Sequence, residues 1–291
     1  MEWSDRMNAA ISYIEDNLAG NIDYDEAANR AYCSTHHFQK TFYAIIGITP
    51  AEYVRRRRLT LAARELATGK SRIIDIALKY GYDSPVSFSR AFRNLHGVTP
   101  TAARGFEETL IAYPRVMFHI ELKGSDDMDY RIIEKPAFDI VGISRNYYAS
   151  RGELEREAPK FWGEWVRTEE YISLLGLAKW QYGPVTQVPV MSAYLLNENE
   201  TWDPVENVMG IEKTANMNAD GFQIFHIPAA TYAEFNGTLD KSSDIFKRIH
   251  SEWFPSTGYE HDSKPDIEQY IQWTFSRVVH VRWWIPIVKK R

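Results

Sequence analysis

The sequence S-T-H-H-F-Q-K-T-F (residues 34–42), followed by G-I-T-P (47–50), returns fifty residues later as S-P-V-S-F-S-R-A-F (84–92) and G-V-T-P (97–100). Upstream, Ala27 and Tyr32 match Ala77 and Tyr82 at the same offset, so the repeat runs without an insertion. Self-similarity at a fixed period indicates one supersecondary unit that the chain uses twice.

Each copy has the pattern of two helices joined by a tight turn. Serine is a preferred helix cap, phenylalanines follow at helical spacing, and a glycine stands where the second helix would end. If the phenylalanines point inward, the opposite faces carry Thr35, His36, Gln39 and Lys40 in the first copy and Pro85, Val86, Ser89 and Arg90 in the second. Several of these side chains suit base edges, so we predict that both faces read double-stranded DNA. The alternative is a helical domain whose polar faces are only solvated.

A long helix is predicted between the two copies. Thr49-Pro50-Ala51-Glu52 has the residue types of a helix start, and no glycine or proline follows until Gly69. The four arginines at 55–58 spread around the whole helix, so they cannot all face DNA. We predict phosphate contacts from Arg55 and Arg57, and from Arg93 on the second reading helix.

The charge distribution separates two parts of the chain. Residues 35–104 contain 12 Lys or Arg and 4 Asp or Glu, whereas residues 108–291 contain 20 basic and 27 acidic residues. The net charge of −5 therefore hides a basic segment that suits phosphates. A single cysteine, Cys33, permits neither an internal disulfide nor a thiolate zinc cluster. We expect no metal, no cofactor and no catalytic residue.

The length of 291 residues favours two domains, and a hydrophobic content of 44% with 25% charged residues is typical of a globular protein. No apolar run approaches the roughly 20 residues of a membrane-spanning helix. The charged start lacks the apolar core of a signal peptide, so we expect a cytoplasmic protein that does not enter a membrane.

The segment from Asp5 to Phe106 resembles the DNA-binding domain of the AraC/XylS transcription regulators. The most specific match is I-x-D-I-A-x-x-x-G-Y-x-S from Ile73, followed by F-x-R-x-F and G-x-T-P. The resemblance implies two reading helices, held by the long helix, in successive major-groove turns. Because both lie in one chain, such a domain can bind DNA as a monomer. It also implies a structural role for Arg58. Relatives differ at His36, Lys40, Pro85 and Val86, so we expect a different operator.

A second domain is predicted after a linker. We divide the chain into an all-α DNA-binding domain at 1–107, a linker at 108–128 with a possible strand at 116–122, and an α+β domain at 129–291. Alternating runs predict strands within 130–143, where Pro136 separates a first strand from a second apolar run that begins at Phe138, and at 190–196, 221–227, 231–236 and 277–288. Amphipathic patterns predict helices at 153–175 and 239–254. This order indicates two similar halves, with strands followed by a helix at 130–175 and again at 221–254.

The second domain is rich in aromatic residues, which suggests a pocket for a flat or cationic small molecule or, alternatively, a filled core. It is similar to the GyrI-like (Rob-type) effector-binding domains through E-K-P-A-F-D-I-V-G-I (134–143), A-A-T-Y-A-E-F (229–235), D-I-E-Q-Y (266–270) and W-W-I-P-I (283–287). The resemblance implies an α+β fold of two strand-helix-strand-strand repeats with a ligand groove between them. The candidate groove residues are Tyr147, Trp162, Trp165, Tyr182, Glu268, Tyr270 and either Arg282 or Trp283.

The charge of the ligand is left open by the sequence. Relatives that bind lipophilic cations carry a glutamate in the last strand where this chain has Arg282. If Arg282 points inward, it favours an anion or pairs with Glu268. The strand period of two puts Arg282 and Trp284 on one face and Trp283 on the other.

The resulting hypothesis is a transcription regulator whose second domain senses a small aromatic or lipophilic effector. One alternative is a hydrolase-like second domain in which Glu268 and Tyr270 act as base and donor. Another is a module that binds a protein such as RNA polymerase.

Overall fold

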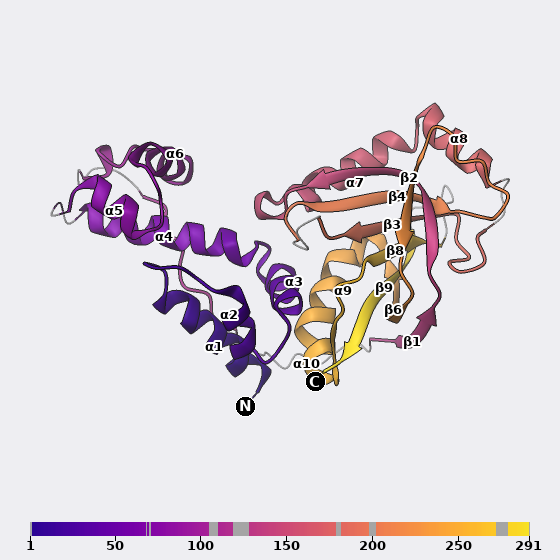
Figure 1. Ribbon diagram of the computed structural model, residues 1–291, viewed down its shortest axis with the longest axis horizontal. Coiled ribbons are helices and arrows are strands. Elements are labelled where there is room, and N and C mark those ends of the chain that lie inside the picture. Colours follow the sequence, from indigo (N-terminus) through magenta and orange to yellow (C-terminus); the bar gives the residue numbers. More distant parts are fainter. Residues whose placement is uncertain are drawn as a thin grey trace. The chain divides into compact units, whose positions relative to one another are not determined.

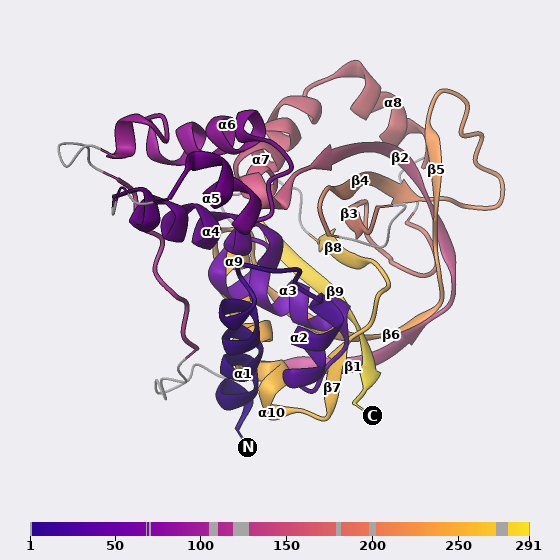
Figure 2. The same cartoon turned by 60° about the vertical axis from the view of Figure 1, so that its left-hand side comes forward.

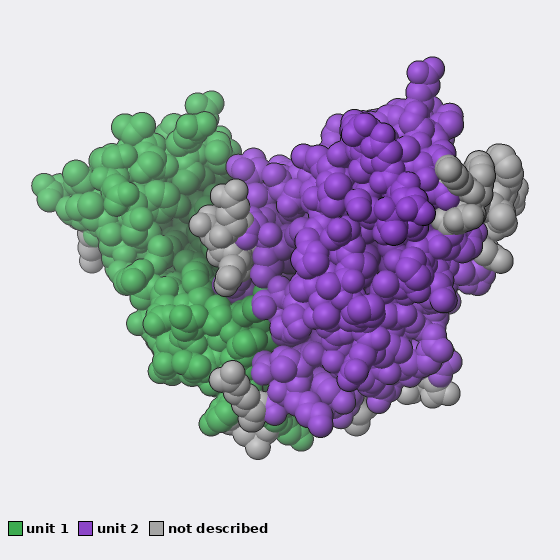
Figure 3. All heavy atoms as spheres, turned by 45° about the vertical axis from the view of Figure 1, so that its right-hand side comes forward, with its two compact units in different colours: residues 1–38, 50–121 green, residues 39–49, 122–291 purple. Residues whose placement is uncertain are grey.

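In the computed structural model, the described residues are 2–67, 69, 71–104, 110–118, 128–178, 182–197, 202–271 and 279–290. They belong to two compact units (Figure 3). Unit 1 consists of residues 1–38 and 50–121, and unit 2 of residues 39–49 and 122–291. Unit 2 thus includes residues 39–49, which the sequence pattern assigned to the DNA-binding domain.

Unit 1 is helical (Figure 1). Its elements are α1 (Trp3–Asp16), α2 (Tyr24–Arg30), α4 (Pro50–Ala67), α5 (Ile73–Lys79), α6 (Pro85–His96) and the 3-10 turn η1 (Ala102–Arg104). The helix α3 (Thr35–Ile46) begins in unit 1 and continues in unit 2. Helix α4 covers the range that the proline start and the absence of breakers predicted. Its Leu59 and Leu66 pack with Phe88 and Phe92 of α6 in the core.

The two copies of the repeat do not keep one offset. Helices α3 and α6 are fifty residues apart, but α2 and α5 are 49 apart, with Ala27 and Ala28 buried at the positions of Ile76 and Ala77. The turn residue with positive φ is Tyr32 (54°) in the first copy and Gly81 (77°) in the second. The prediction of a repeat without an insertion was wrong. By sequence alone, Ala77 can be matched to Ala27 at an offset of 50 or to Ala28 at an offset of 49.

The caps match between the copies. The Ser34 hydroxyl accepts a bond from the His37 amide and the Ser84 hydroxyl from the Ser87 amide, both at 3.2 Å. Gly97 ends α6 with a positive φ, a conformation that glycine adopts without strain.

Part of the predicted linker belongs to unit 1. The Phe118 amide donates to Asn8 Oδ1 at 2.8 Å, and the Tyr113 amide donates to Thr60 Oγ1 at 3.0 Å. Residues 110–118 form no strand, and the rest of the strand predicted at 116–122 lies outside the described residues. The extended segment is held by side chains of α1 and α4.

Unit 2 is built on one antiparallel sheet (Figure 2). Its nine described strands are β1 (Tyr130–Lys135), β2 (Phe138–Tyr147), β3 (Val190–Leu195), β4 (Val205–Glu212), β5 (Gln223–Ile227), β6 (Ala230–Thr238), β7 (Tyr259–His261), β8 (Asp266–Tyr270) and β9 (His280–Lys289). The order is β1-β6-β9-β8-β3-β4-β2-β5, with β7 paired to β9. All five residues of β8, in the middle of this order, are buried.

Helices cover one face of this sheet. They are α7 (Glu153–Trp165) after the turn η2 (Ala149–Arg151), α8 (Glu169–Leu177), and a run formed by η3 (Leu239–Lys241), α9 (Ser242–Arg248), the π-helical turn η4 (Ile249–Trp253) and α10 (Phe254–Ser256). Trp165 and Leu174 pack on β2, β3 and β4, while Phe254 and Trp253 pack on β6 and β9. The helix predicted at 153–175 is interrupted, because Thr168 caps a new helix by accepting from the Tyr171 amide. That the unit consists of two repeats stays a prediction.

Gly142, in the motif that suggested the effector domain, lies directly opposite Gly210 of β4. A Cβ atom on Gly142 would stand 2.0 Å from the Met209 carbonyl oxygen. A side chain at this position would therefore push β2 and β4 apart.

Among the described residues, the longest apolar stretch of any helix falls short of what a bilayer crossing needs.

Candidate DNA-reading helices and effector site

The second reading helix, α6, presents the face that the sequence predicted. Phe88 and Phe92 are fully buried, whereas Pro85, Val86 and Arg90 are exposed and Ser89 is half-buried. Ser89, Arg90, Arg93, Asn94 and Thr99 line a surface hollow. The helix thus offers an apolar contact at Val86 beside two guanidinium groups.

The first reading helix, α3, differs from its prediction. Thr35 and His36 are half-buried in unit 1, and the Thr35 hydroxyl donates to Asp25 at 2.5 Å. Gln39 is half-buried in unit 2, but Lys40 is only 1% exposed and forms an ion pair with Asp266. The expectation that Lys40 lies on an outward, base-reading face does not agree with this burial. Helical periodicity cannot show which partner covers a face.

The arginines of α4 are engaged within unit 1. Arg55 forms a bidentate pair with Glu52 at 2.7 and 2.8 Å and keeps a side-chain exposure of 42%. Arg57 donates to both carboxylate oxygens of Glu15 and to the Tyr113 carbonyl. Since these bonds employ three of its nitrogens, Arg57 fits a structural role better than the predicted phosphate contact. Arg58 donates to the carbonyls of Leu18 and Gly20, as its expected structural role requires.

Glu268 is the centre of the candidate effector site. It lies on β8 with its side chain directed to the helix-covered face, in register with Ser192 on β3 and Trp283 on β9. The Tyr194 hydroxyl donates to Glu268 Oε2 at 2.7 Å. Burial raises the pKa of this carboxyl above its ordinary value, against the opposing effect of bonds from Tyr194 and Trp283. In the part of the chain that the structure describes, Glu268 forms no ion pair.

Aromatic rings surround this carboxylate. Trp162 of α7 makes an edge-to-face contact with Tyr270 at 5.1 Å between centroids, and its indole donates to Ser192 at 3.1 Å. Trp283 is buried in the same cluster as Tyr270. Of the candidates predicted from the sequence, the structure brings together Trp162, Glu268, Tyr270 and Trp283. Trp165 extends this group through its contact with Trp162.

Three other candidates lie elsewhere. Tyr147 is buried in a separate cluster with Trp202, and Tyr182 is 59% exposed. Arg282 lies in register with Gln269 and approaches Glu234 at 3.6 Å, on the face opposite to Glu268. Trp283 lies in register with Glu268 and shares its face, so the neighbouring Arg282 on the same strand points to the opposite face. The hypothesis that Arg282 pairs with Glu268 was therefore wrong.

Sequence reasoning missed Tyr194 and Ser192. Their strand was predicted, and its period of two put them on one face. The pairing of β3 with β8 was the missing information, since register depends on the assembled sheet.

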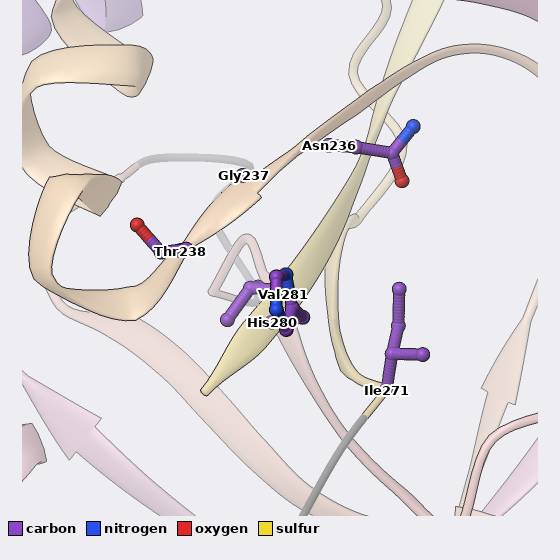
Figure 4. Close-up of a pocket in the computed structure, with 6 residues that line it drawn as sticks. All are labelled: Asn236, Gly237, Thr238, Ile271, His280 and Val281. Carbon is purple, nitrogen blue, oxygen red and sulfur yellow. The ribbon is translucent and has the colours of Figure 1, made fainter. Parts of the chain in front are cut away.

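A pocket of about 550 Å³ opens at the ends of three strands (Figure 4). It is lined by Asn236, Gly237, Thr238, Ile271, His280 and Val281. Asn236 lies in register with Arg282, and Thr238 with His280, so most of this lining is on the face of the sheet opposite to Glu268.

Two family models match the chain. The helix-turn-helix domain model matches residues 27–105, and the model of the integron-associated effector binding proteins matches residues 131–287, which is more than half of the chain.

Curated relatives match the first part of the chain. The transcriptional activator AarP of Providencia stuartii is 37% identical over 110 residues, which cover 36% of this chain and 82% of AarP. The regulatory protein SoxS of Escherichia coli K12 is 36% identical over 94 residues, covering 32% of this chain and 88% of SoxS.

Solved structures resemble both parts. An AraC-type regulator from Chromobacterium violaceum has 27% identity over 34% of this chain and 88% of its own, with a TM-score of 0.33. The structure of SAV2435 bound to tetraphenylphosphonium has 15% identity over 55% of this chain and 94% of its own, with a TM-score of 0.44.

Proposed function

Because the chain belongs to the AraC-type DNA-binding transcription regulators and carries an effector-binding domain of the integron-associated family, we propose that its effector is a lipophilic organic cation bound at Glu268. The family model that matches residues 131–287 describes effector binding proteins, which gives the alternative of a hydrolase-like second domain no support. The observation that carries the proposal is a buried carboxylate, without an ion-pair partner among the described residues, within an aromatic cluster.

The electrostatics favour a cation. An ionised carboxylate in an apolar interior is costly unless an opposite charge approaches it. Trp162, Tyr270 and Trp283 supply apolar contact area around the carboxylate. Arg282 does not neutralise Glu268, because it lies on the other face of the sheet. An anion would be repelled by the ionised carboxylate.

For DNA, we propose that α6 reads bases through Val86, Ser89 and Arg90, while Arg93 and the half-exposed Arg55 contact phosphates. The support is the exposure of these side chains on a basic segment. Thr35, His36 and Gln39 remain candidates on α3. Since both reading helices lie in one chain, we propose binding as a monomer. An additional contact with RNA polymerase stays a prediction.

The effector proposal is tested by titrating the full chain with tetraphenylphosphonium and with tetraphenylborate, which have the same shape and opposite charge. Trp162 and Trp283 provide the fluorescence signal. We expect the cation to quench it with at least tenfold higher affinity than the anion. Equal affinity would show that shape alone is recognised, and preference for the anion would overturn the proposal.

The DNA proposal is tested by selecting bound sequences from random duplexes with the full chain and measuring affinity for the selected duplex and a scrambled one. A single chain per duplex in light scattering is expected. Equal affinity for both duplexes would contradict sequence-specific reading.

A further inference from the structure

Lys40 is held by groups of unit 2. Its ammonium forms an ion pair with Asp266, and the Trp202 ring lies 4.0 Å from the nitrogen. The side chains of Lys40 and Asp266 are 1% and 6% exposed. Burial lowers the pKa of Lys40, and Asp266 acts in the opposite direction. A buried lysine loses the hydration of its ammonium group and needs such partners in its place. Asp266 and Trp202 therefore form a binding site for the Lys40 side chain.

The neighbours of Lys40 on α3 also contact residues of unit 2. Thr41 Oγ1 lies 3.2 Å from His250 Nδ1, and the Tyr43 hydroxyl donates to Glu155. Tyr43 also packs with Trp202 in one buried cluster. Residues 39–49 therefore belong to unit 2 through several polar and apolar contacts.

Asp266 and Glu268 share a strand and a face. They stand two residues apart on β8, a distance of about 7 Å along a strand. Tyr194 connects them, because it lies in register with Asp266 and donates its hydroxyl to Glu268. The second oxygen of Asp266 is 2.7 Å from His261 Nε2. A cation bound at Glu268 would thus stand near the ammonium of Lys40 and repel it.

We propose that Asp266 and Trp202 form a latch that holds Lys40, and with it residues 39–49 of the first reading helix, away from DNA until a cationic effector at Glu268 releases them. The inference rests on the proposed function of Glu268 and adds the link between effector and DNA. A held Lys40 cannot donate to a base edge.

The latch is tested in the full chain by acetylating amines and quantifying each lysine by mass spectrometry. Lys160, whose side chain is 62% exposed, is the internal reference. We expect Lys40 to react at least tenfold more slowly than Lys160, and tetraphenylphosphonium to remove most of this protection. Equal rates without the cation would overturn the latch.

The carboxylate is tested by Asp266→Asn, with Asp262→Asn as the matched control, since Asp262 pairs with Lys264 instead. Asp266→Asn should expose Lys40 to acetylation without any cation and tighten binding to the selected duplex about tenfold. Asp262→Asn should change neither. Tighter binding with Lys40 still protected would contradict the proposed cause.

A third variant covers the case in which Asp266→Asn fails to fold. Lys40→Met removes the charge and keeps most of the unbranched side chain. Hydrogen exchange of residues 39–49 should rise on adding tetraphenylphosphonium to the wild type and stay unchanged in Lys40→Met; the same rise in both would overturn the latch. If tetraphenylphosphonium does not bind at all, the effector proposal fails. The acetylation rate of Lys40 in Asp266→Asn then still shows whether Asp266 protects this lysine.

Discussion

Glu268 and Arg282 lie on opposite faces of adjacent strands, with Glu268 in register with Trp283 and Arg282 in register with Gln269. Arg282 donates to Gln269 and approaches Glu234, so its charge is balanced on its own face. The carboxylate on the other face forms no ion pair among the described residues. This separation is the reason why we propose a cation and not an anion.

Glu268→Gln should remove the preference for a cation. Glutamine keeps the shape and can still accept from Tyr194, but it carries no charge. We expect the affinity for tetraphenylphosphonium to fall at least tenfold, which corresponds to about 1.4 kcal/mol, while tetraphenylborate binds no worse. Fluorescence titration measures both. Glu234→Gln is the control on the other face, and an equal loss there would show a global effect.

Cation binding should depend on pH. Because burial raises the pKa of Glu268 above the ordinary 4.5, affinity should fall about tenfold per unit as pH drops below that raised pKa. The same shift stabilises the folded state at low pH, and this stability is lost as pH rises through the folded pKa. Calorimetry in buffers of different ionisation enthalpy should detect proton release on binding. In Glu268→Gln both effects should vanish.

Arg90→Ala and Arg93→Ala should affect DNA binding in different ways. Arg90 is proposed to read a base, so its loss should cost about 1–3 kcal/mol on the selected duplex and relax preference at one position. Arg93 is proposed to contact phosphate, so its loss should weaken all duplexes alike and reduce the salt dependence by about one ion. Repeating the selection with each variant separates the two. A uniform loss for Arg90→Ala would contradict its role.

Arg57→Ala should destabilise unit 1. Arg57 and Glu15 have side-chain exposures of 12% and 10%, and the mutation leaves Glu15 with the Tyr53 hydroxyl. Breaking a buried pair costs about 3 kcal/mol, measured by chemical denaturation. Arg30→Ala breaks the exposed pair with Glu26 and should cost no more than about 0.5 kcal/mol.

The stability from this pair should also depend on pH. Burial tends to raise the pKa of Glu15, but the bonds from Arg57 and Tyr53 outweigh it and lower the pKa below 4.5. The contribution is therefore present at neutral pH and is lost as pH falls through the folded pKa. The difference in stability between wild type and Arg57→Ala should therefore shrink as pH falls below the lowered pKa of Glu15. A difference that stays constant throughout acid titration would contradict the pair as the cause.

Local signals predicted much of the fold. The serine caps, the phenylalanine spacing and the proline at the start of α4 act within a few residues, so α3, α4 and α6 could be located from sequence. The offset of 49 between α2 and α5 could not, because adjacent alanines fit two registers equally well. The strand period likewise separated Arg282 from Trp283 without showing which face is covered.

The sequence by itself determined the two kinds of domain and the segment that suits DNA, and it predicted four members of the aromatic cluster around Glu268, because periodicity and residue chemistry are local properties. The tertiary structure decided that Tyr194 donates to Glu268, that Arg57 pairs with Glu15, and that Lys40 is buried against Asp266. Each of these depends on contacts between residues more than 40 positions apart, which only chain assembly brings together.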